Sequence, residues 1–320
     1  MRKIGILTSG GDAPGMNAAI RAAVRTAVYK GVDIYGIYRG YEGLIDGEIK
    51  EMNISSVSDI LHTGGTVLRT ARSERFMTEE GQKRALHMLE SFGIEGLVVV
   101  GGDGSLHGGL ALSRRGIPVM GVPGTIDNDL AYTKYTIGFD TAVNTVLSAV
   151  SNIRDTSSAH ERTTVIEVMG RHCGDIALHA GLAGGAEAIL IPELKYNINE
   201  ICKKIIQGRN RGKLHSIIVK AEGIELSANE LADKIAENTG LDVKIVVLGY
   251  IQRGGAPTAR DRILASIMGS KAVELLIEES ESRAIGIDGD EIVHFDLADA
   301  LAVGRSCDER MLELADMLSI

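Results

Sequence analysis

The sequence predicts an α/β protein whose sheets are mainly parallel. Short apolar runs bounded by Gly or Pro, such as Leu97–Val100 and Val119–Val122, are typical of strands buried on both faces. Stretches of helical composition alternate with these runs, which is the pattern of βαβ units. Motifs rich in Gly and Asp follow the runs directly, and open α/β sheets bind ligands at the carboxyl ends of their strands.

The composition indicates a large aliphatic core and excludes several classes of partner. Of 320 residues, 44% are hydrophobic but only 4% are aromatic. The net charge of −9 argues against general nucleic-acid binding, which leaves a basic footprint. Three widely spaced Cys residues match neither a zinc site nor a disulfide framework, and no apolar run approaches the roughly 18 residues of a membrane span. We therefore expect a cytoplasmic protein with no nucleic-acid or membrane partner.

The first predicted elements are a strand over Lys3–Thr8, a glycine-rich loop over Ser9–Asn17 and a helix over 18–29. A loop in this position can bind a phosphate, because the N–H groups of the helix point at the anion. The loop is neither a Walker A motif nor a Gly-x-Gly-x-x-Gly motif, so a plain tight turn remains the alternative. A second strand is expected over Asp33–Tyr38 and a further helix over Glu79–Phe92.

Two motifs at successive strand ends carry residues suited to catalysis. Gly101–Ser105 is expected to form a glycine-rich turn whose backbone phosphates can approach closely, and it offers one carboxylate suited to Mg²⁺. Pro123–Asp129 offers two carboxylates two residues apart, with a Thr hydroxyl before them. Gly and Asp are also ordinary turn residues. A metal-binding acid close to a candidate base is nevertheless what phosphoryl transfer requires, and two such clusters favour that function.

Arginine residues add candidate anion ligands. Arg21 and Arg25 lie one turn apart on the first helix and share a face, so they suit a phosphate or an acidic neighbouring subunit. A solvated face is the alternative for this pair. Arg72 follows two glycines, and its guanidinium group can bond phosphate oxygens in pairs.

A second α/β alternation begins after the second motif, and the pattern changes near Gly138. Helices are expected over 141–152, 174–183 and 261–279. The expected strands lead into motifs that carry Arg, Glu or Lys, and they cover Thr163–Val168, Ala188–Ile191, Ser216–Val219 and Lys244–Leu248.

Together these stretches resemble the bacterial ATP-dependent 6-phosphofructokinase family over essentially the whole chain. The motifs that carry the resemblance are Leu7–Asn17, Gly101–Ser105, Pro123–Asp129, Met169–Arg171 and Gln252–Gly255. The resemblance implies two Rossmann-like three-layer αβα domains with mainly parallel sheets. It places a larger ATP-binding domain at 1–138 plus about 252–304, and a smaller fructose 6-phosphate-binding domain at 139–251 plus about 305–320.

The resemblance also implies the reaction and the roles of single residues. MgATP would phosphorylate the 1-hydroxyl of fructose 6-phosphate, the committed step of glycolysis, in a homotetramer whose active sites are shared between subunits. Asp127 would be the general base and Asp103 would bind Mg²⁺. The other catalytic residues would be Arg72, Thr125, Asp129 and Arg171. The nucleotide would be bound by Gly11, Tyr41, Arg72, Ser73, Gly102, Asp103, Gly104, Ser105 and Gly108. The sugar phosphate would be bound by Thr125, Ile126, Asp127, Arg162, Met169, Gly170, Arg171, Glu222, Lys244, Tyr250, Ile251, Gln252 and Arg253.

An effector site follows from the same resemblance. ADP or GDP would activate the enzyme there, and phosphoenolpyruvate would inhibit it. Glu187 would bind the activator's Mg²⁺ and repel a metal-free anion. The full set is Arg21, Arg25, Ile54, Ser55, Asp59, Arg154, Gly185, Glu187, Arg211, Lys213 and His215.

Two positions depart from the family pattern, and alternatives remain. Lys244 and Tyr250 stand where most relatives have Arg and His. We therefore expect weaker substrate binding, by about 1 kcal/mol for each lost charge-assisted bond.

Relatives that use pyrophosphate carry Asp and Lys where this chain has Gly104 and Gly124, which would leave room for the α-phosphate of ATP. A pyrophosphate-dependent enzyme and a catalytically weak sugar-phosphate-binding subunit are the alternatives.

Overall fold

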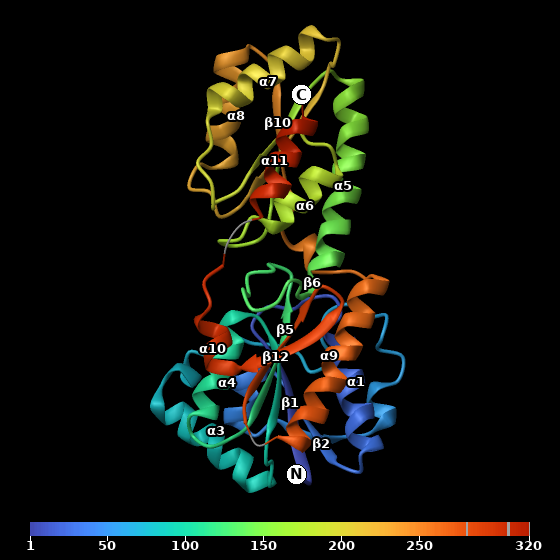
Figure 1. The fold of residues 1–320 in the computed structure, drawn as a ribbon, viewed down its shortest axis with the longest axis vertical. Coiled ribbons are helices and arrows are strands. Elements are labelled where there is room, and N and C mark those ends of the chain that lie inside the picture. The colour runs from blue at the N-terminus through green and yellow to red at the C-terminus, as the bar shows by residue number, and fades with distance from the viewer. Residues whose placement is uncertain (280, 306–307, 320) are drawn as a thin grey trace. The chain divides into compact units, whose positions relative to one another are not determined.

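The computed structural model describes residues 1–320 except 280, 306, 307 and 320, and it divides the chain into two compact units (Figure 1). Unit 1 comprises Met1–Ile126, Leu130–Thr141 and Arg253–Arg305. Unit 2 comprises Asp127–Asp129, Ala142–Gln252 and Ser306–Ile320. Each unit consists of helices packed on a mostly or wholly parallel sheet, so the predicted α/β fold class is confirmed.

The sheet of unit 1 has the strand order β12-β11-β5-β4-β1-β2-β3, with β6 paired to β5. Its central strands are parallel, and the two outer pairs, β2 with β3 and β11 with β12, are antiparallel. The central strands are almost wholly buried, as their apolar sequences predict. The strands are β1 (Lys3–Ser9), β2 (Asp33–Ile37), β3 (Ile49–Met52), β4 (Leu97–Gly101), β5 (Val119–Thr125), β6 (Ile137–Gly138), β11 (Arg283–Asp288) and β12 (Glu291–Asp296).

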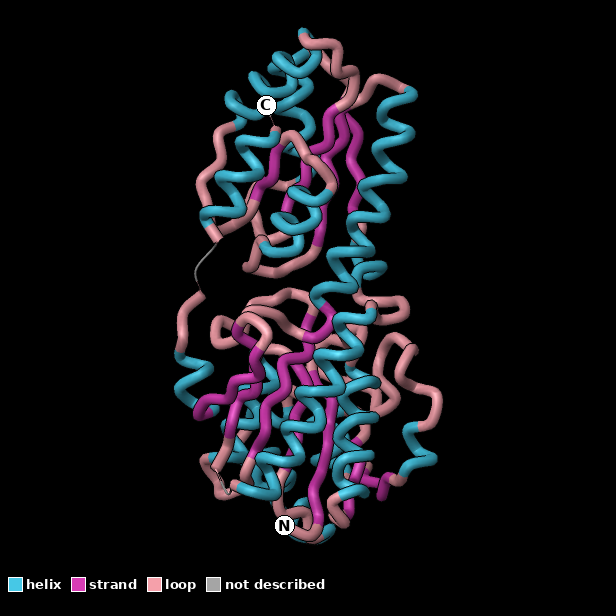
Figure 2. The backbone as a smooth tube through the Cα atoms, turned by 45° about the vertical axis from the view of Figure 1, so that its right-hand side comes forward, coloured by secondary structure: helices cyan, strands magenta, loops and turns pink. Residues whose placement is uncertain are grey.

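Helices cover both faces of this sheet (Figures 1 and 2). On one face α1 packs against α9, and on the other a core of Leu, Ile, Val and aromatic side chains joins the sheet to α2, α3, α4 and α10. The helix α3 begins after the Thr78 side chain, which accepts a bond from the Gly81 N–H, and it ends at Gly93 with φ of 69°. The elements are α1 (Met16–Tyr29), α2 (Gly40–Asp46), η1 (Ile54–Val57), η2 (Arg75–Met77), α3 (Glu79–Phe92), α4 (Asp103–Ser113), α9 (Ala259–Glu278) and α10 (Leu297–Ala302).

The sheet of unit 2 is wholly parallel, in the order β10-β7-β9-β8. A core that includes Leu190 joins one face to α7 and α8, while Ile189, the preceding residue, meets α6 at Gly181 on the other. Ser227 and Glu230 form a capping box that starts α8. The elements are α5 (Phe139–Ala159), β7 (Thr163–Val168), α6 (Asp175–Ala183), β8 (Ala188–Leu190), α7 (Ile198–Asn210), β9 (Ser216–Ala221), α8 (Ala228–Thr239), β10 (Val243–Val247), η3 (Gly249–Gln252) and α11 (Glu309–Leu318).

One charged side chain is fully buried in this second sheet. Lys220 on β9 is 1% exposed, and its Nζ donates to Oε2 of Glu167 at 2.9 Å and to the carbonyl oxygen of Ala221 at 3.2 Å. The two strands place Lys220 directly opposite Glu167 in their register. A buried ammonium group needs such a partner, because its desolvation is otherwise costly.

Two sequence expectations can be compared directly with these elements. The helix expected over 141–152 is longer at both ends, since α5 runs from Phe139 to Ala159. Within the part of the chain that is described, no helix combines the length and the apolar character that a bilayer crossing demands. Cys173 and Cys202 are buried thiols, and Cys307 lies outside the described residues.

Candidate active site

The three glycine-rich motifs of unit 1 lie at one edge of its sheet. Strand register pairs Ser9 of β1 with Gly101 of β4, and Gly101 with Pro123 of β5. The carboxyl ends of these three parallel strands are therefore neighbours, as the sequence predicts. The residues that follow them share this edge, and they include Gly11, Gly102, Asp103, Thr125 and Ile126.

The motif Gly101–Ser105 is the start of a helix rather than the turn that the sequence suggests. Gly102 is the N-cap of α4, and Asp103 is its first residue. The N–H groups of a first helical turn lack partners within the helix and favour anions. The turn expected here is wrong. The N–H groups of the first turn of α4 are instead the groups that could bind a phosphate.

Asp103 can hold a divalent cation only with help from a ligand. Its carboxylate is half exposed, and Oδ1 lies 3.2 Å from Nδ1 of the exposed His107. Among the described residues, no group of three His, Cys, Asp or Glu side chains could hold a metal ion by itself. Mg²⁺ is commonly bound by one or two carboxylates together with substrate phosphates, so the residues present fit Mg²⁺ that arrives with a nucleotide.

The first glycine loop is in contact with an arginine. A Cβ atom placed on Gly11 would lie 3.3 Å from Nη1 of Arg253. The resemblance assigns Arg253 to the sugar phosphate, yet its guanidinium group lies beside this loop. Thr70 Oγ1 donates to the carbonyl oxygen of Gly10 at 2.8 Å and ties the segment before the exposed Arg72 to the same loop.

Two residues expected to bind the nucleotide have packing roles in unit 1. Tyr41 is buried, its ring stacks on Phe76 with centroids 4.1 Å apart, and its hydroxyl donates to the Ser105 carbonyl at 2.6 Å. A Cβ on Gly108 would lie 2.6 Å from the Tyr41 ring, which explains the glycine there. The hydroxyl of Ser73 donates to the Glu42 carboxylate. Tyr41 thus supports the first turn of α4, while Ser73 joins the segment before η2 to Glu42 of α2.

Replacing Tyr41 by Phe keeps the ring stack and removes one buried hydrogen bond. The Ser105 carbonyl would lose its donor, so we expect the free energy of unfolding to fall by about 1 kcal/mol. Urea unfolding followed by circular dichroism measures this, at one protein concentration for both proteins. A variant as stable as the wild type would mean that the Tyr41 hydroxyl contributes nothing to packing.

An ionic cluster beside Tyr41 should make the stability of unit 1 sensitive to acid. Arg75 contacts Glu42 at 2.5 Å and Asp46 at 3.0 Å. The hydrogen bonds from Ser73 and Arg75 lower the pKa of Glu42, and the bond from Arg75 lowers the pKa of Asp46. Because both pKa values are lowered in the folded state, this contribution is present above the ordinary values of 4.5 and 3.8 and is lost as the pH falls through the folded-state values.

We expect the variant Arg75→Met to reduce this dependence on acid. Urea midpoints at about pH 6 and about pH 3.5 should differ less in Arg75→Met than in the wild type, because the part of each lowered pKa that Arg75 causes is gone. Equal differences in the two proteins would contradict this assignment.

In unit 2 a buried carboxylate faces an arginine. Asp127 is 5% exposed, and its Oδ2 lies 4.0 Å from Nε of Arg171, whose side chain is 56% exposed. Arg171 has φ of 54°, and its N–H donates to Oε1 of Glu222 at 3.0 Å. A Cβ on Gly223 would lie 1.9 Å from the Arg171 carbonyl oxygen, so only glycine fits there. The ends of β7 and β9 thus hold Arg171 toward Asp127.

Among the other predicted substrate residues of unit 2, two basic side chains share one ion-pair partner and one buried side chain holds a loop in place. Arg162 and Lys244 share one carboxylate, Asp242, at 3.1 Å and 2.9 Å. Gln252 is fully buried, and its Oε1 accepts the Met169 N–H at 3.1 Å, so this side chain holds the loop at Gly170. Tyr250 and Ile251 are exposed. The sequence analysis missed Asp242, although its spacing of two from Lys244 was a signal that both side chains lie on one face of a strand.

The predicted effector residues lie partly in each unit. In unit 1, Arg21 and Arg25 belong to α1, which packs against η1 with Ile54 and Ser55, and Asp59 follows with φ of 55°. In unit 2, the described contacts join Arg154 to the Gly185 carbonyl and Glu187 to both Lys213 and the Ile217 N–H. Burial lowers the pKa of His215, the charge of Glu187 opposes this, and the charges of Arg154 and Lys213 add to the lowering. Arg211 ends α7.

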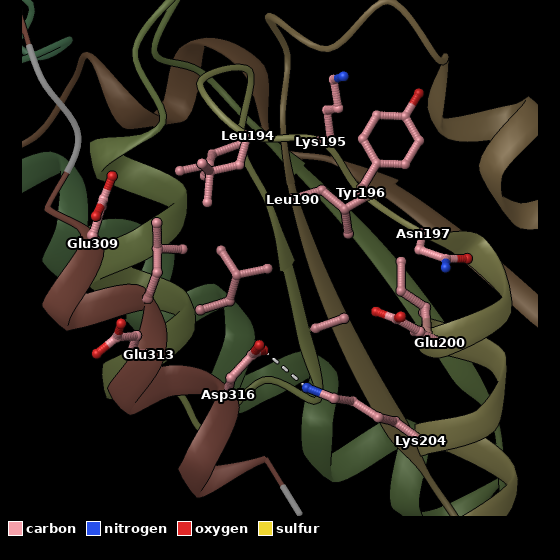
Figure 3. A pocket seen from close by; sticks show the side chains of 15 residues that line it. Leu190, Leu194, Lys195, Tyr196, Asn197, Glu200, Lys204, Glu309, Glu313 and Asp316 are labelled. Atoms are coloured by element: carbon pink, nitrogen blue, oxygen red, sulfur yellow. Dashed lines mark hydrogen bonds and ion pairs between the residues drawn. The ribbon is translucent and has the colours of Figure 1, made fainter.

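A separate pocket lies in unit 2 between β8, α7 and α11 (Figure 3). Its volume is about 370 Å³, and an ion pair of 2.9 Å between Lys204 and Asp316 joins α7 to α11 beside it. None of the predicted site residues lines it.

The fold and the strand-end motifs define an α/β enzyme that transfers phosphoryl groups. A family model described as phosphofructokinase matches residues 3–276, and the chain belongs to this family. It is 61% identical over 320 residues to the ATP-dependent 6-phosphofructokinase of Alkaliphilus metalliredigens and 60% identical over 319 residues to that of Clostridium tetani, with full coverage of both chains in each case.

Solved structures agree with this assignment. Phosphofructokinase from Saccharomyces cerevisiae is 37% identical with a TM-score of 0.89, and the match covers all of this chain and 48% of the yeast chain. The chain thus spans about half the length of the yeast protein. A pyrophosphate-dependent phosphofructokinase from Marinobacter aquaeolei has a TM-score of 0.84 at 23% identity, with 98% of this chain and 91% of that chain covered, and it shows the shared fold alone.

Proposed function

We propose that this protein transfers the γ-phosphoryl group of ATP to the 1-hydroxyl of fructose 6-phosphate. The observation that carries the proposal lies within unit 2, where the buried Asp127 carboxylate faces the Arg171 guanidinium at 4.0 Å. Relatives that are about 60% identical over their whole length bear the name of this activity.

Each named residue has a chemical role in this reaction. Asp127 takes the proton from the sugar hydroxyl as its oxygen attacks the phosphorus, and its burial keeps competing water away. Arg171 stabilises the charge on the transferring group, together with Arg72, while Thr125 and Asp129 help to hold that group. Asp103 would hold Mg²⁺ together with the nucleotide, and the ion would neutralise negative charge on the phosphates.

The choice of ATP over pyrophosphate is supported by Gly104 but not by Gly124. A Cβ on Gly104 would meet nothing within 4 Å, so space for a further phosphate exists beside α4. A Cβ on Gly124 would lie 2.9 Å from Cγ1 of Val100 and 3.3 Å from Cε of Met16. Packing between neighbouring strands therefore also explains Gly124, and the expectation that it leaves room for the α-phosphate stays a prediction.

Substrate binding and regulation follow the family pattern in this proposal. Unit 1 binds the nucleotide and unit 2 binds the sugar phosphate, in a homotetramer where Arg162 and Lys244 reach the 6-phosphate of a neighbouring subunit. Their shared bond to Asp242 would break or loosen on binding, which costs affinity. ADP or GDP activates and phosphoenolpyruvate inhibits at the effector residues, where Glu187 must first leave Lys213 to bind Mg²⁺.

A coupled assay of fructose 1,6-bisphosphate formation, run with MgATP and separately with pyrophosphate, tests the proposal. Activity with ATP alone is the expected result. The variant Gly104→Asp should raise the KM for ATP by about tenfold or more, because a carboxylate would repel the phosphates. Gly304→Asp, where a Cβ also meets nothing within 4 Å, is the matched control and should behave as the wild type. Activity only with pyrophosphate would overturn the choice of donor.

A further inference from the structure

We propose that Asn128 and Asp175 form a positioning pair that fixes the carboxylates on either side of Asn128. This inference rests on the proposed function, because it concerns the general base Asp127. Asn128 stands between Asp127 and Asp129, is 1% exposed and has φ of 52°. A left-handed conformation is unusual for any residue with a side chain, and it persists only where the surroundings enforce it.

The first constraint on Asn128 comes from its own amide group. Nδ2 of Asn128 donates to Oδ2 of Asp175 at 2.7 Å, and Asp175 is 9% exposed. A bond from an amide to a buried carboxylate is short and strong because the acceptor is charged. Asp175 is the first residue of α6, and this position favours a negative charge. The acceptor is therefore present whenever the helix is formed, and it sets the orientation of the amide.

The second constraint comes from the same loop that carries Arg171. The thiol of Cys173 contacts the carbonyl oxygen of Asn128 at 3.8 Å, and the Cys173 N–H donates to Gly170 at 2.9 Å. Asn128 is thus held at its backbone by Cys173 and at its side chain by Asp175. Arg171, which faces Asp127, lies between these anchors and the end of β7. One short loop therefore positions both the Arg171 guanidinium group and the Asp127 carboxylate that faces it.

The consequence is a fixed distance between the Arg171 guanidinium group and the Asp127 carboxylate. If the pair were broken, Asn128 could leave its left-handed conformation, and Asp127 would turn with the backbone. A displacement of about 1 Å at a reacting group can lower a rate by about 100-fold. We therefore expect the pair to affect kcat and not the KM for either substrate.

Exchanging the two side chains tests the pair. Asn128→Asp puts a second carboxylate against Asp175, and kcat should fall by about 100-fold with unchanged KM values. Asp175→Asn keeps an amide oxygen as acceptor and should change kcat little. In the double variant Asn128→Asp, Asp175→Asn the bond is restored with its donor and acceptor exchanged, so kcat should recover by about tenfold or more over Asn128→Asp. Asn152→Asp, an exposed change on α5, controls for added charge.

The outcomes separate this inference from the proposed function. All variants are compared at equal folded concentration, judged from their thermal unfolding, so that a loss of stability is not read as a loss of rate. An active wild type whose double variant stays as slow as Asn128→Asp would overturn the positioning pair alone. A wild type without transfer to fructose 6-phosphate would overturn both the pair and the proposed function.

Discussion

Replacing Asp127 by Asn is expected to lower kcat for phosphoryl transfer by about 10²–10⁴-fold, because positioned proton transfer contributes this much in enzymes. The amide has the shape of the carboxylate but cannot accept the proton of the sugar hydroxyl. The KM values for both substrates should change little, since the phosphates are bound by other groups.

The same coupled assay measures this loss, with Asp155→Asn on the exposed surface of α5 as the matched control. Thermal unfolding of both variants establishes that they are folded. An Asp127→Asn variant that keeps its rate within a few-fold of the wild type would remove Asp127 from the catalytic role and leave the nearby Asp129 as the remaining candidate.

Replacing Glu167 by Gln is expected to lower the free energy of unfolding of unit 2 by about 3 kcal/mol. The fully buried Lys220 would lose the charge that compensates it and would keep the carbonyl oxygen of Ala221 as an acceptor. Lys220→Met should be close to neutral, because Glu167 is 21% exposed and can be hydrated in part.

Urea unfolding at neutral pH measures both changes, with protein concentration held constant because association alters apparent stability. The decisive result is a larger loss of stability in Glu167→Gln than in Lys220→Met. If Lys220→Met were the more damaging change, the ammonium group would be stabilising the sheet, and a simple desolvation argument would not hold.

Local sequence was sufficient to predict the framework of the site. Runs such as Leu97–Val100 predict buried strands because both faces of a parallel sheet are covered, and Gly residues mark where such strands end. The prediction that the motif Gly101–Ser105 lies at the end of a strand is correct, and the prediction that it forms a turn is wrong. Local composition did not distinguish the two, because Gly102 and Asp103 suit a turn as well as a helix start.

Partners distant in the chain explain what the sequence did not predict. Tyr41 is fixed by Phe76 and Ser105, and Gln252 by Met169, none of which lies near in sequence. The pairing of Asn128 with Asp175 likewise joins residues separated by β6, α5 and β7. Side-chain roles of this kind depend on tertiary packing, which no periodicity or spacing encodes.

The order of strands in unit 1 also bears on how the protein is made. The strand β5 has β4 on one side and β11 on the other, and β11 begins only at Arg283. Because β6 pairs with β5 only at Gly124 and Thr125, a growing chain at about 5–20 residues per second would leave Met120 and Gly121, where β11 pairs, without that parallel neighbour for roughly ten seconds or more. An apolar strand edge in this condition readily pairs with other chains. We infer that a ribosome-bound chain stopped before Arg283 exposes this part of the edge of β5 to pairing with other chains.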